Sequence, residues 1–535
     1  MGSPNSLGSM VEINLHSSGM VTGAIPESQS SSSTSLNHRP LFEYGNTRTG
    51  YSTVPILARR EALMQLHLYG HVTIDNYDGP RDPKNPQNWN AWAKWYCIFV
   101  IAFMCFINNI GASVISLAIP SIASEYDVSR VIATLGISLY VLGLGIGPLL
   151  SAPLSEQFGR HTVYKVSHIC SLFVQLPAAL GSQRFNIGAW LFFRLLSGIF
   201  ASPGPSLGAG TVADLFTEQT RALPLLVFVA SAFSGAAFGP VLSGIVVFKH
   251  SWNWTLWITM ILSACLFPFV YFMPETHRNK ILDKDVLRRQ IRGELVERPM
   301  KRGFRDMMFT ALERPPRLLL TEPIVLLFSI YSGFVYMLLY GFTSSLPYIY
   351  QNIYSFNILE SGLPFLAICV GITLTVPIHM LFFEPIYRRK SSPVPPEARL
   401  PPMIAAAVAM VVALLMFAWT AGLGVHWAAP VIAGCIFGFA ALGLFVPHVA
   451  YITDCFPEVA ASAVSANGLI RYTMGFVFPL ISRIMIENLG VKWAMTVLGV
   501  IAAAMLPLPL FFMRYGRRIR EKGRYNQSSD VISVV

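Results

Sequence analysis

The chain has 535 residues, of which 53% are hydrophobic and only 13% are charged, and its mean hydropathy is +0.52. This composition would leave a soluble protein without enough polar side chains to cover its surface, so it excludes a soluble enzyme and indicates a membrane protein. The net charge of +11 would suit a nucleic acid, but the basic residues flank apolar segments, where they set orientation and contact headgroups, so we expect no nucleic-acid partner.

Residues 1–70 are polar and include a serine-rich run from Ser28 to Ser35. A segment of this composition buries too little apolar area to offset its chain entropy, so we expect a disordered tail. The regions expected along the chain are the tail at 1–70, a pre-span segment at 71–94, a six-helix bundle at 95–274, a linker at 275–322, a second six-helix bundle at 323–514 and a C-terminal tail at 515–535.

The two bundle regions are defined by twelve predominantly apolar segments, six on each side of the basic linker. Because a helix needs roughly 20 apolar residues to cross the hydrocarbon core of a bilayer, each segment is expected to span the membrane. The sequence therefore predicts an all-α membrane protein of twelve transmembrane helices. The spans are expected near residues 97–117, 131–151, 163–182, 187–208, 222–247, 254–273, 324–346, 361–383, 403–424, 428–450, 460–486 and 491–513.

The loops between the spans differ in charge. The linker, the even-to-odd loops and the C-terminal tail carry twenty-five Lys and Arg residues, whereas the opposite side carries five. Positive residues are retained in the cytoplasm, so both termini and the linker are predicted to be cytoplasmic. Within the linker, Phe304, Met307, Met308, Ala311 and Leu312 recur at helical spacing, which indicates an amphipathic helix at the membrane surface, and the stretch 281–291 shows a weaker version.

A polar turn follows the second span, where residues 152–161 read Ala-Pro-Leu-Ser-Glu-Gln-Phe-Gly-Arg-His. Gly159 permits a tight turn, and Glu156 at a helix end can pair with Arg160 or with a cation on a neighbouring helix. An ordinary turn whose charged side chains reach to the membrane surface is the alternative.

The fourth and fifth spans hold further polar and small residues. Arg194 in span four would cost roughly 2.5–3.5 kcal/mol at the midplane, so it is expected to face the interior and to hold a substrate or, alternatively, a structural partner. In span five, small residues four positions apart make a flat face for close helix contact, and a proline kinks the helix. The span-five pattern comprises Gly235, Gly239, Pro240, Ser243 and Gly244.

This arrangement of spans and motifs resembles the major facilitator superfamily, in which two bundles face each other across a midplane site. The loop at 152–161 resembles the family's Gly-x-Leu-Ala-Asp-Arg-x-Gly-Arg-Lys motif, span four its Arg-x-x-Gln-Gly-x-Gly-Ala-Ala motif, and span five its antiporter motif Gly-x-x-x-Gly-Pro-x-x-Gly-Gly. Among the residues that depart from these motifs are Ala152, Glu156, His161, Ser197, Phe200 and Ser243. Together with the stretch from Asp78 to Trp89, these motifs are similar to the fungal drug:proton antiporters, which include multidrug, polyamine and cercosporin facilitator-like mycotoxin exporters.

The resemblance implies an exporter of the plasma membrane that works by alternating access and exchanges its substrate for protons. It also implies a cytoplasmic latch of Glu156, Gly159 and Arg160, with partners at the junction of spans four and five, and a moving interface at Gly235, Gly239 and Pro240. The expected latch partners are Asp214, Glu218 and Arg221.

The interior of the spans lacks a deep Asp or Glu, so proton coupling is inferred from the resemblance alone. Instead it offers tyrosines, amides, arginines and one histidine that could titrate. The predicted cavity residues are Asn108, Tyr140, Arg194, Tyr336, Tyr340, His448, Asn467 and Arg471. Such groups suit a bulky aromatic, neutral or weakly anionic molecule rather than a polyamine, whose ammonium groups need carboxylates. The alternative for about half of the tyrosines is packing between helices, since aromatic side chains commonly serve both purposes.

Two alternatives to a metabolite exporter remain at this stage, a polyamine or organic-cation exporter and a non-transporting receptor built on the same helices. We expect no cofactor, no metal site and no catalytic residue, because no phosphate-binding loop, zinc signature or nucleophile motif is present. The expected partners are a small-molecule substrate, protons and lipid, with a monomeric chain. Asn253 begins an Asn-Trp-Thr sequon in a predicted outer loop and is a possible glycosylation site.

Overall fold

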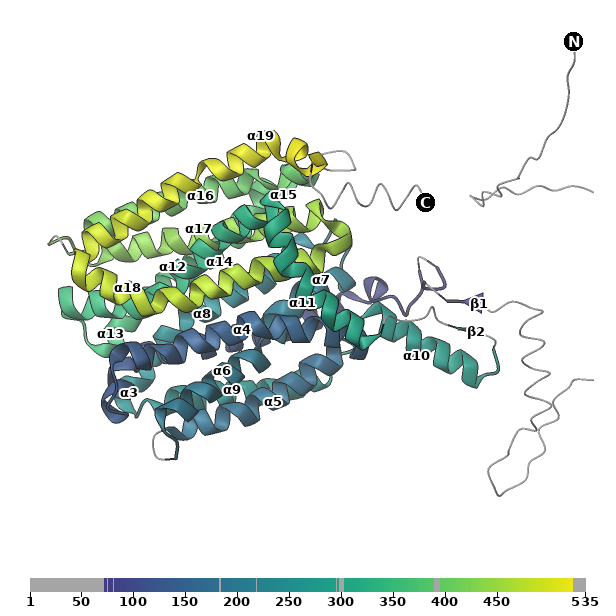
Figure 1. Cartoon of the computed structure of the whole chain (residues 1–535), viewed down its shortest axis with the longest axis horizontal. Coiled ribbons are helices and arrows are strands. Elements are labelled where there is room, and N and C mark those ends of the chain that lie inside the picture. Colours follow the sequence, from purple (N-terminus) through teal and green to yellow (C-terminus); the bar gives the residue numbers. More distant parts are fainter. Residues whose placement is uncertain are drawn as a thin grey trace, which may run out of the picture. The chain divides into compact units, whose positions relative to one another are not determined.

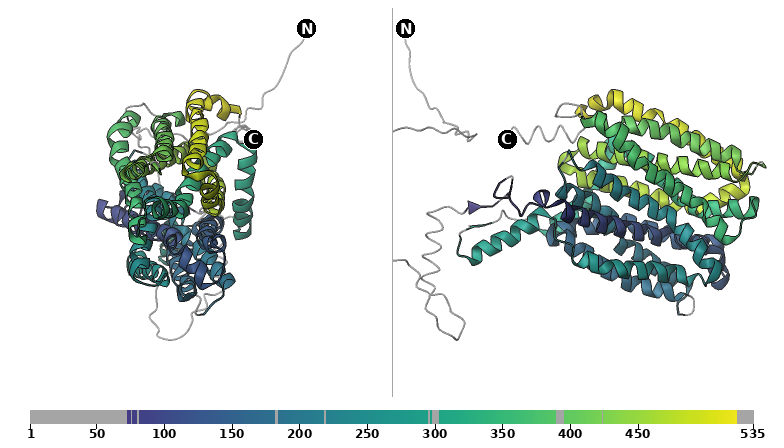
Figure 2. Two further views of the ribbon diagram at one scale, coloured as in Figure 1. Left: turned by 90° about the vertical axis from the view of Figure 1, so that its left-hand side faces the viewer. Right: turned by 180° about the vertical axis from the view of Figure 1, so that it is seen from behind.

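The computed structural model describes residues 72–74, 76–79, 81–181, 184–217, 219–294, 296–297, 303–388, 395–422 and 424–522. The predicted tail at 1–70, Glu218 and most of the predicted C-terminal tail lie outside these residues. Within the described part, long helices lie side by side in two groups, one from each half of the chain (Figures 1 and 2).

The first group contains six apolar segments long enough to cross a membrane. Asparagine and serine side chains fix several of the starting points: Asn90 accepts a hydrogen bond from the backbone of Ala93, and Ser129 accepts one from Ile132. The helices of this group are α2 (Ala91–Ser113), α3 (Ile119–Glu125), α4 (Arg130–Phe158), α5 (Arg160–Leu180), α6 (Ile187–Ala201), α7 (Pro203–Leu215), α8 (Ala222–Lys249) and α9 (Asn253–Tyr271), with α6 and α7 forming one span.

The second group consists of α12 (Pro323–Ile353), α13 (Ile358–Gly362), α14 (Pro364–Ile378), the π-helical turn η3 (His379–Phe383), α15 (Glu384–Arg388), α16 (Pro401–Thr420), α17 (Ala428–Cys455), α18 (Ala460–Met505) and α19 (Pro507–Lys522). Short 3₁₀ turns occur at η1 (Pro86–Asn88), η4 (Pro396–Arg399) and η5 (Pro457–Val459).

The twelve predicted spans are confirmed, although the described residues contain eleven apolar segments of sufficient length. The last segment, Ala460–Glu521, has 62 residues, more than twice what one crossing needs. Gly490 interrupts its helix with φ of 73° and ψ of 158°, a conformation that glycine adopts without strain. The chain turns back there, so this segment supplies both the eleventh and the twelfth span (Figure 1).

The pre-span segment and the linker form a small unit beside the first bundle. Strand β1 (Val72–Thr73) pairs in parallel with β2 (Val296–Glu297), which follows α10 (Arg278–Ile291). The small apolar core of this unit consists of Ile74, Leu282, Val286 and Val296, with Tyr77 packed against it. The pre-span segment therefore covers part of the apolar face of α10.

Charges reinforce this unit. Lys84 Nζ lies 2.8 Å from Asp285 Oδ1, and Arg289 pairs with both Asp285 and Asp78. Burial alone would raise the pKa of Asp285, but the hydrogen bond from Lys84 and the charges of Lys84 and Arg289 outweigh it and lower that pKa. The second linker helix, α11 (Phe304–Thr321), occupies the predicted amphipathic stretch and packs against α4, α12 and α18, so it contacts both groups of helices.

Candidate functional site

An aromatic cluster joins the two bundles near the middle of the long helices. Tyr336 of α12 lies at its centre, with ring centroids 5.3 Å from Phe233 of α8, 5.8 Å from Phe445 of α17 and 5.6 Å from Tyr472 of α18. Tyr340 stands one turn further along α12, 5.9 Å from Tyr336. Because α8 belongs to the first bundle and the other helices to the second, the cluster lies between the two.

Arg471 inserts its guanidinium among these rings. Its Cζ is 4.5 Å from the ring centroid of Tyr336, 4.8 Å from that of Phe445 and 4.6 Å from that of Tyr472. Such contacts offset part of the cost of removing a cation from water. The described residues show no ion pair for Arg471, and its buried Nε has no hydrogen-bond partner. Arg471 is also the member of the predicted cavity set that keeps intermediate exposure, whereas the other seven are buried.

Two further predicted cavity residues lie beside Arg471. His448 is 2% exposed and lies close enough to Asn467 and Arg471 to interact with both. Asn467 is 1% exposed and donates from Nδ2 to Ser332 Oγ at 2.8 Å. The Nε2 of His448 and the Oδ1 of Asn467 have no hydrogen-bond partner of good geometry.

The two asparagines of α2 form hydrogen bonds with different bundles. Asn108 donates to the carbonyl of Ala201 at 2.8 Å, and Tyr140 donates to the carbonyl of Asn108 at 3.0 Å, so both predicted cavity residues bond within the first bundle. The neighbouring Asn109 accepts a hydrogen bond from Tyr340 at 3.1 Å. This bond links the first bundle to the aromatic cluster.

Arg194 is fully buried in the first bundle rather than gathered with the aromatic cluster. Its Nε donates to the carbonyl of Gly136 at 2.9 Å, and its Nη2 donates to the carbonyl of Gly111 at 2.8 Å. The ring of Tyr140 lies 4.7 Å from its Cζ. The contacts of Arg194 thus join α2, α4 and α6, as expected of a structural partner.

The predicted latch residues divide into two contacts. Arg160 Nε lies 2.5 Å from Asp214 Oδ2, and the backbone N–H of Arg160 donates to Glu275 at 3.0 Å. Gly159, with φ of 91°, separates α4 from α5. Glu156 is exposed at the end of α4.

Arg221 makes the second contact, with a residue of the other bundle. Its Nη2 lies 3.6 Å from Asp454 Oδ1, and Asp454 also accepts from Arg399 at 3.0 Å. Sequence reasoning missed the roles of Glu275 and Asp454. The Pro-Glu-Thr run that closes span six was the available signal for Glu275, because a carboxylate there can accept from free backbone N–H groups.

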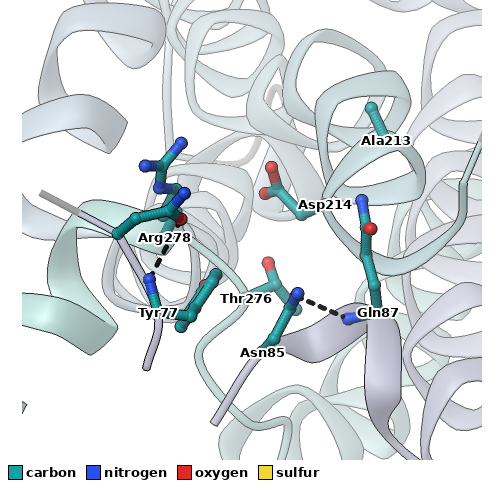
Figure 3. A pocket seen from close by; sticks show the side chains of 8 residues that line it. Tyr77, Asn85, Gln87, Ala213, Asp214, Thr276 and Arg278 are labelled. Atoms are coloured by element: carbon teal, nitrogen blue, oxygen red, sulfur yellow. Dashed lines mark hydrogen bonds between the residues drawn. The ribbon is translucent and has the colours of Figure 1, made fainter. Parts of the chain in front are cut away.

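A polar pocket of about 260 Å³ lies next to Asp214, where the pre-span segment meets the first bundle (Figure 3). Asp214, Thr276 and Arg278 are among the side chains that line it (Figure 3), and burial raises the pKa of Tyr77 at its edge to about 12. Its lining residues are Asn76, Tyr77, Asn85, Gln87, Ala213, Asp214, Thr276 and Arg278.

The span-five motif contacts both bundles. A Cβ on Gly235 would meet the backbone of Phe106, and one on Gly239 would meet Ser113, so these two glycines face α2. A Cβ on Gly244 would lie 3.0 Å from the carbonyl oxygen of Ile358, at α13 of the second bundle.

The remaining residues of the span-five motif are Ser243 and Pro240. Ser243 accepts a hydrogen bond from the backbone of Leu117 at 3.3 Å. A Cβ on Gly362 would lie 2.9 Å from the carbonyl oxygen of Pro240. The part of the motif after Gly239 therefore includes the contact with the second bundle.

Asn253, the predicted glycosylation site, begins α9 and is half-buried, while Thr255 of the same sequon is buried. Among the described residues, no group of three or more His, Cys, Asp or Glu side chains is placed to hold a metal ion.

Two bundles of six spans around a central aromatic cluster define a membrane transporter. The sequence profile of the Major Facilitator Superfamily matches residues 101–479. The chain belongs to this superfamily and is a multi-pass membrane transporter.

Named relatives and a solved structure agree with this assignment. Polyamine transporter 4 of Saccharomyces cerevisiae is 34% identical over 491 residues, covering 85% of this chain and 73% of that protein. The ascochitine biosynthesis cluster MFS transporter of Didymella fabae is 33% identical over 468 residues, covering 85% of this chain and 89% of the relative. The proton:xylose symporter XylE bound to 6-bromo-6-deoxy-D-glucose shares the fold, with a TM-score of 0.58 at 14% identity over 80% of this chain and 96% of XylE.

Proposed function

We propose that this transporter exports a hydrophobic aromatic metabolite, toxin or drug across the plasma membrane in exchange for protons. The observation that carries the proposal is the aromatic cluster around Arg471, to which helices of both bundles contribute. Flat aromatic faces and a guanidinium suit a bulky aromatic ligand with polar oxygens. A site built from both halves is rearranged whenever the halves move relative to each other.

Contacts between the bundles occur at both ends of the helices and support alternating access. Arg221 and Asp454 pair at the end where the linker lies, and the positive charge of the loops at that end predicts a cytoplasmic position for it and for both termini. Gly244 approaches α13 at the opposite end. Opening either contact while the other holds would expose the central cluster to one side of the membrane at a time.

Proton exchange is supported by the resemblance of the Gly235–Gly244 run to the antiporter motif. The test uses the purified full-length chain in proteoliposomes with an imposed pH gradient, and follows uptake of a fluorescent aromatic compound such as a naphthalene derivative. Uptake that follows the gradient and disappears when a proton ionophore collapses it is expected. If uptake does not depend on the pH gradient, the proposed proton exchange is wrong.

The role of the aromatic cluster is tested by Tyr336→Leu, which removes the central ring. We expect transport to fall at least about tenfold, because each aromatic contact contributes about 1 kcal/mol and Tyr336 makes several. Tyr515→Leu is the matched control, since Tyr515 lies exposed on α19. Equal transport by the two variants would show that the aromatic cluster does not bind the substrate.

A polyamine exporter is the second candidate, because one relative is named a polyamine transporter. Burying ammonium groups requires carboxylates, whereas the central cluster presents Arg471 and aromatic rings. Excess spermidine is therefore expected not to compete with the aromatic probe, and competition at micromolar concentration would favour the polyamine candidate. Deleting residues 1–70 tests a receptor role for that tail, and transport is expected to survive.

A further inference from the structure

The second bundle contains a half-buried arginine, Arg471, whose buried Nε has no hydrogen-bond acceptor in the protein. Arg471 lies among Tyr336, Phe445 and Tyr472, whose ring faces offset part of its charge but supply no hydrogen-bond acceptor to Nε. Buried donors of folded proteins are almost always bonded, and a buried charge without an opposite charge is costly. An anionic oxygen of a ligand would meet both needs.

Two hydrogen-bond acceptors lie beside this cation. Asn467 precedes Arg471 by one helical turn and directs its Nδ2 to Ser332 on α12, which leaves Oδ1 free to accept. His448 has Nδ1 at 3.3 Å from the carbonyl of Leu444, and a carbonyl can only accept, so the proton of the neutral ring lies on Nδ1. The unpartnered Nε2 of His448 therefore carries a lone pair.

His448 and Asn467 lie close enough to interact, but with the ring proton assigned to Nδ1 neither Nε2 nor Oδ1 can donate to the other. The Oδ1 of Asn467 and the Nε2 of His448 both accept, and neither has a proton to give. The His448 ring is also held in place, because it stacks with Phe328 at 6.5 Å and meets Phe445 edge-on at 5.0 Å. The site consequently lacks one anion for Arg471 and one hydroxyl or N–H donor for the two acceptors.

We propose that Arg471, Asn467 and His448 form a subsite for an oxyanion that carries a separate hydroxyl group, and that the substrate is an aromatic hydroxy acid. The proposal rests on the proposed function, since the aromatic rings around Arg471 hold the body of the same molecule. Four residues separate Asn467 from Arg471, about 6 Å along the helix axis. A hydroxyl in the meta position to a carboxylate on an aromatic ring suits that spacing, whereas an ortho hydroxyl would bond its own carboxylate.

The test uses the purified full-length chain and three naphthalene probes of matched size. They are 4-hydroxy-2-naphthoate, its methyl ester, and 4-methoxy-2-naphthoate, which keeps the anion but cannot donate a hydrogen bond. Binding is measured by titration calorimetry and transport in proteoliposomes. We expect the hydroxy acid to bind at least about tenfold more tightly than the ester and several-fold more tightly than the methoxy acid.

Variants then assign each preference to a side chain. Arg471→Gln should remove the preference for the acid over the ester, and Arg471→Lys should keep a weakened one, because lysine retains the charge without the planar fork. Asn467→Ala should remove the preference for hydroxyl over methoxy. Arg483→Gln is the control, since Arg483 pairs with Glu487 on its own helix and should change neither preference.

The outcomes separate this inference from the function on which it rests. If the wild-type chain binds and transports the ester as well as the acid, or if Arg471→Gln keeps the preference for the acid, the oxyanion subsite is wrong while aromatic export stands. If the wild-type chain transports none of the three probes, the proposed function fails as well.

Discussion

Both bundles carry an arginine within a membrane span, and the surroundings of Arg194 and Arg471 differ. Arg194 in the first bundle is fully buried and donates to the carbonyls of Gly136 and Gly111. Arg471 in the second bundle keeps intermediate exposure, has aromatic rings on its guanidinium and leaves Nε without an acceptor. Arg194 therefore links helices of the first bundle, whereas Arg471 is the arginine that we propose binds the substrate.

The difference shows that a charge inside a membrane protein is not by itself a sign of a binding site. Both arginines meet the expectation that an intramembrane charge faces the protein interior. Each leaves one buried nitrogen without a hydrogen-bond partner, Nη1 of Arg194 and Nε of Arg471. What separates them is that Arg194 also donates to two backbone carbonyls on other helices, whereas Arg471 is surrounded by aromatic side chains. An arginine bonded to two backbone carbonyls acts as a cross-link between helices, whereas an anion can still bind an arginine held mainly by aromatic side chains.

The largest expected effect follows from removing the first arginine. Arg194→Gln would leave the carbonyls of Gly136 and Gly111 without a donor, and each lost hydrogen bond to a charged group costs roughly 1.5–3 kcal/mol. We expect the variant to lose about 3 kcal/mol of stability or more, measured by thermal unfolding of the purified chain in detergent. Arg194→Lys should not restore it, because one ammonium cannot reach two carbonyls on α2 and α4 as a fork does. A melting temperature equal to that of the wild type would show that the carbonyl contacts contribute little.

The next effect concerns close packing in the first bundle. A Cβ on Gly239 would collide with Ser113 of α2, and overpacking of this kind costs about 1–3 kcal/mol. Gly239→Ala should therefore lower both stability and transport while the chain still inserts in the membrane, and a bulkier residue should abolish transport. Gly434→Ala on α17 is the control, since its Cβ would meet only the Ile368 side chain, at 3.6 Å. Equal behaviour of the two variants would contradict a special role for the tight contact.

The sequence predicted these helices well because their signals are local. Apolar run length located the spans, and even the merged last helix agrees with two predicted spans because Gly490 supplies the break between them. Gly159 likewise lies at the turn after the second span, as predicted from the sequence. Such features need only neighbouring residues, so they can be read without knowledge of the fold.

The candidate site was harder to predict because it depends on which residues of distant helices meet. The acceptors of Arg194 are backbone carbonyls of glycines, which leave no side-chain signal in the sequence. Glu275 accepts from the backbone of Arg160, 115 residues away, and no local pattern specifies that contact. Asn108 and Asn109 are adjacent on α2, yet only the facing helices decide that Asn109 bonds Tyr340 while Asn108 bonds Ala201.

A smaller effect on stability is expected at the second arginine. Arg471→Gln removes a half-buried charge that has no carboxylate partner among the described residues, so it leaves no opposite charge unpaired. Replacing such a charge is often neutral or stabilising, so the unfolding free energy should change by less than about 1 kcal/mol or rise. The same thermal unfolding measurement as for Arg194→Gln gives a direct contrast. A loss as large as that of Arg194→Gln would mean that Arg471 is also a cross-link.

The smallest effect concerns a salt bridge that joins the two bundles at the linker end. Arg221 and Asp454 are each roughly a quarter exposed, at 28% and 21%, so water and salt weaken their attraction. Partly exposed pairs of this kind contribute up to about 1 kcal/mol, so Arg221→Gln should change the transport rate by no more than about fivefold. In Arg221→Gln, Asp454 still pairs with Arg399, so its carboxylate is not left without a cation.

The control for this contact is a pair that does not cross between the bundles. Arg483 and Glu487 lie 2.7 Å apart on one helix, so Arg483→Gln should leave the transport rate unchanged. Raising the salt concentration to about 1 M shortens the screening length to roughly 3 Å. The transport rate of the wild type should then approach that of Arg221→Gln, and the rate of the variant itself should change less. If salt changes the wild type and Arg221→Gln equally, the pair does not limit movement of the bundles, and the apolar contacts between α4 and α18 and between α8 and α14 must set the rate.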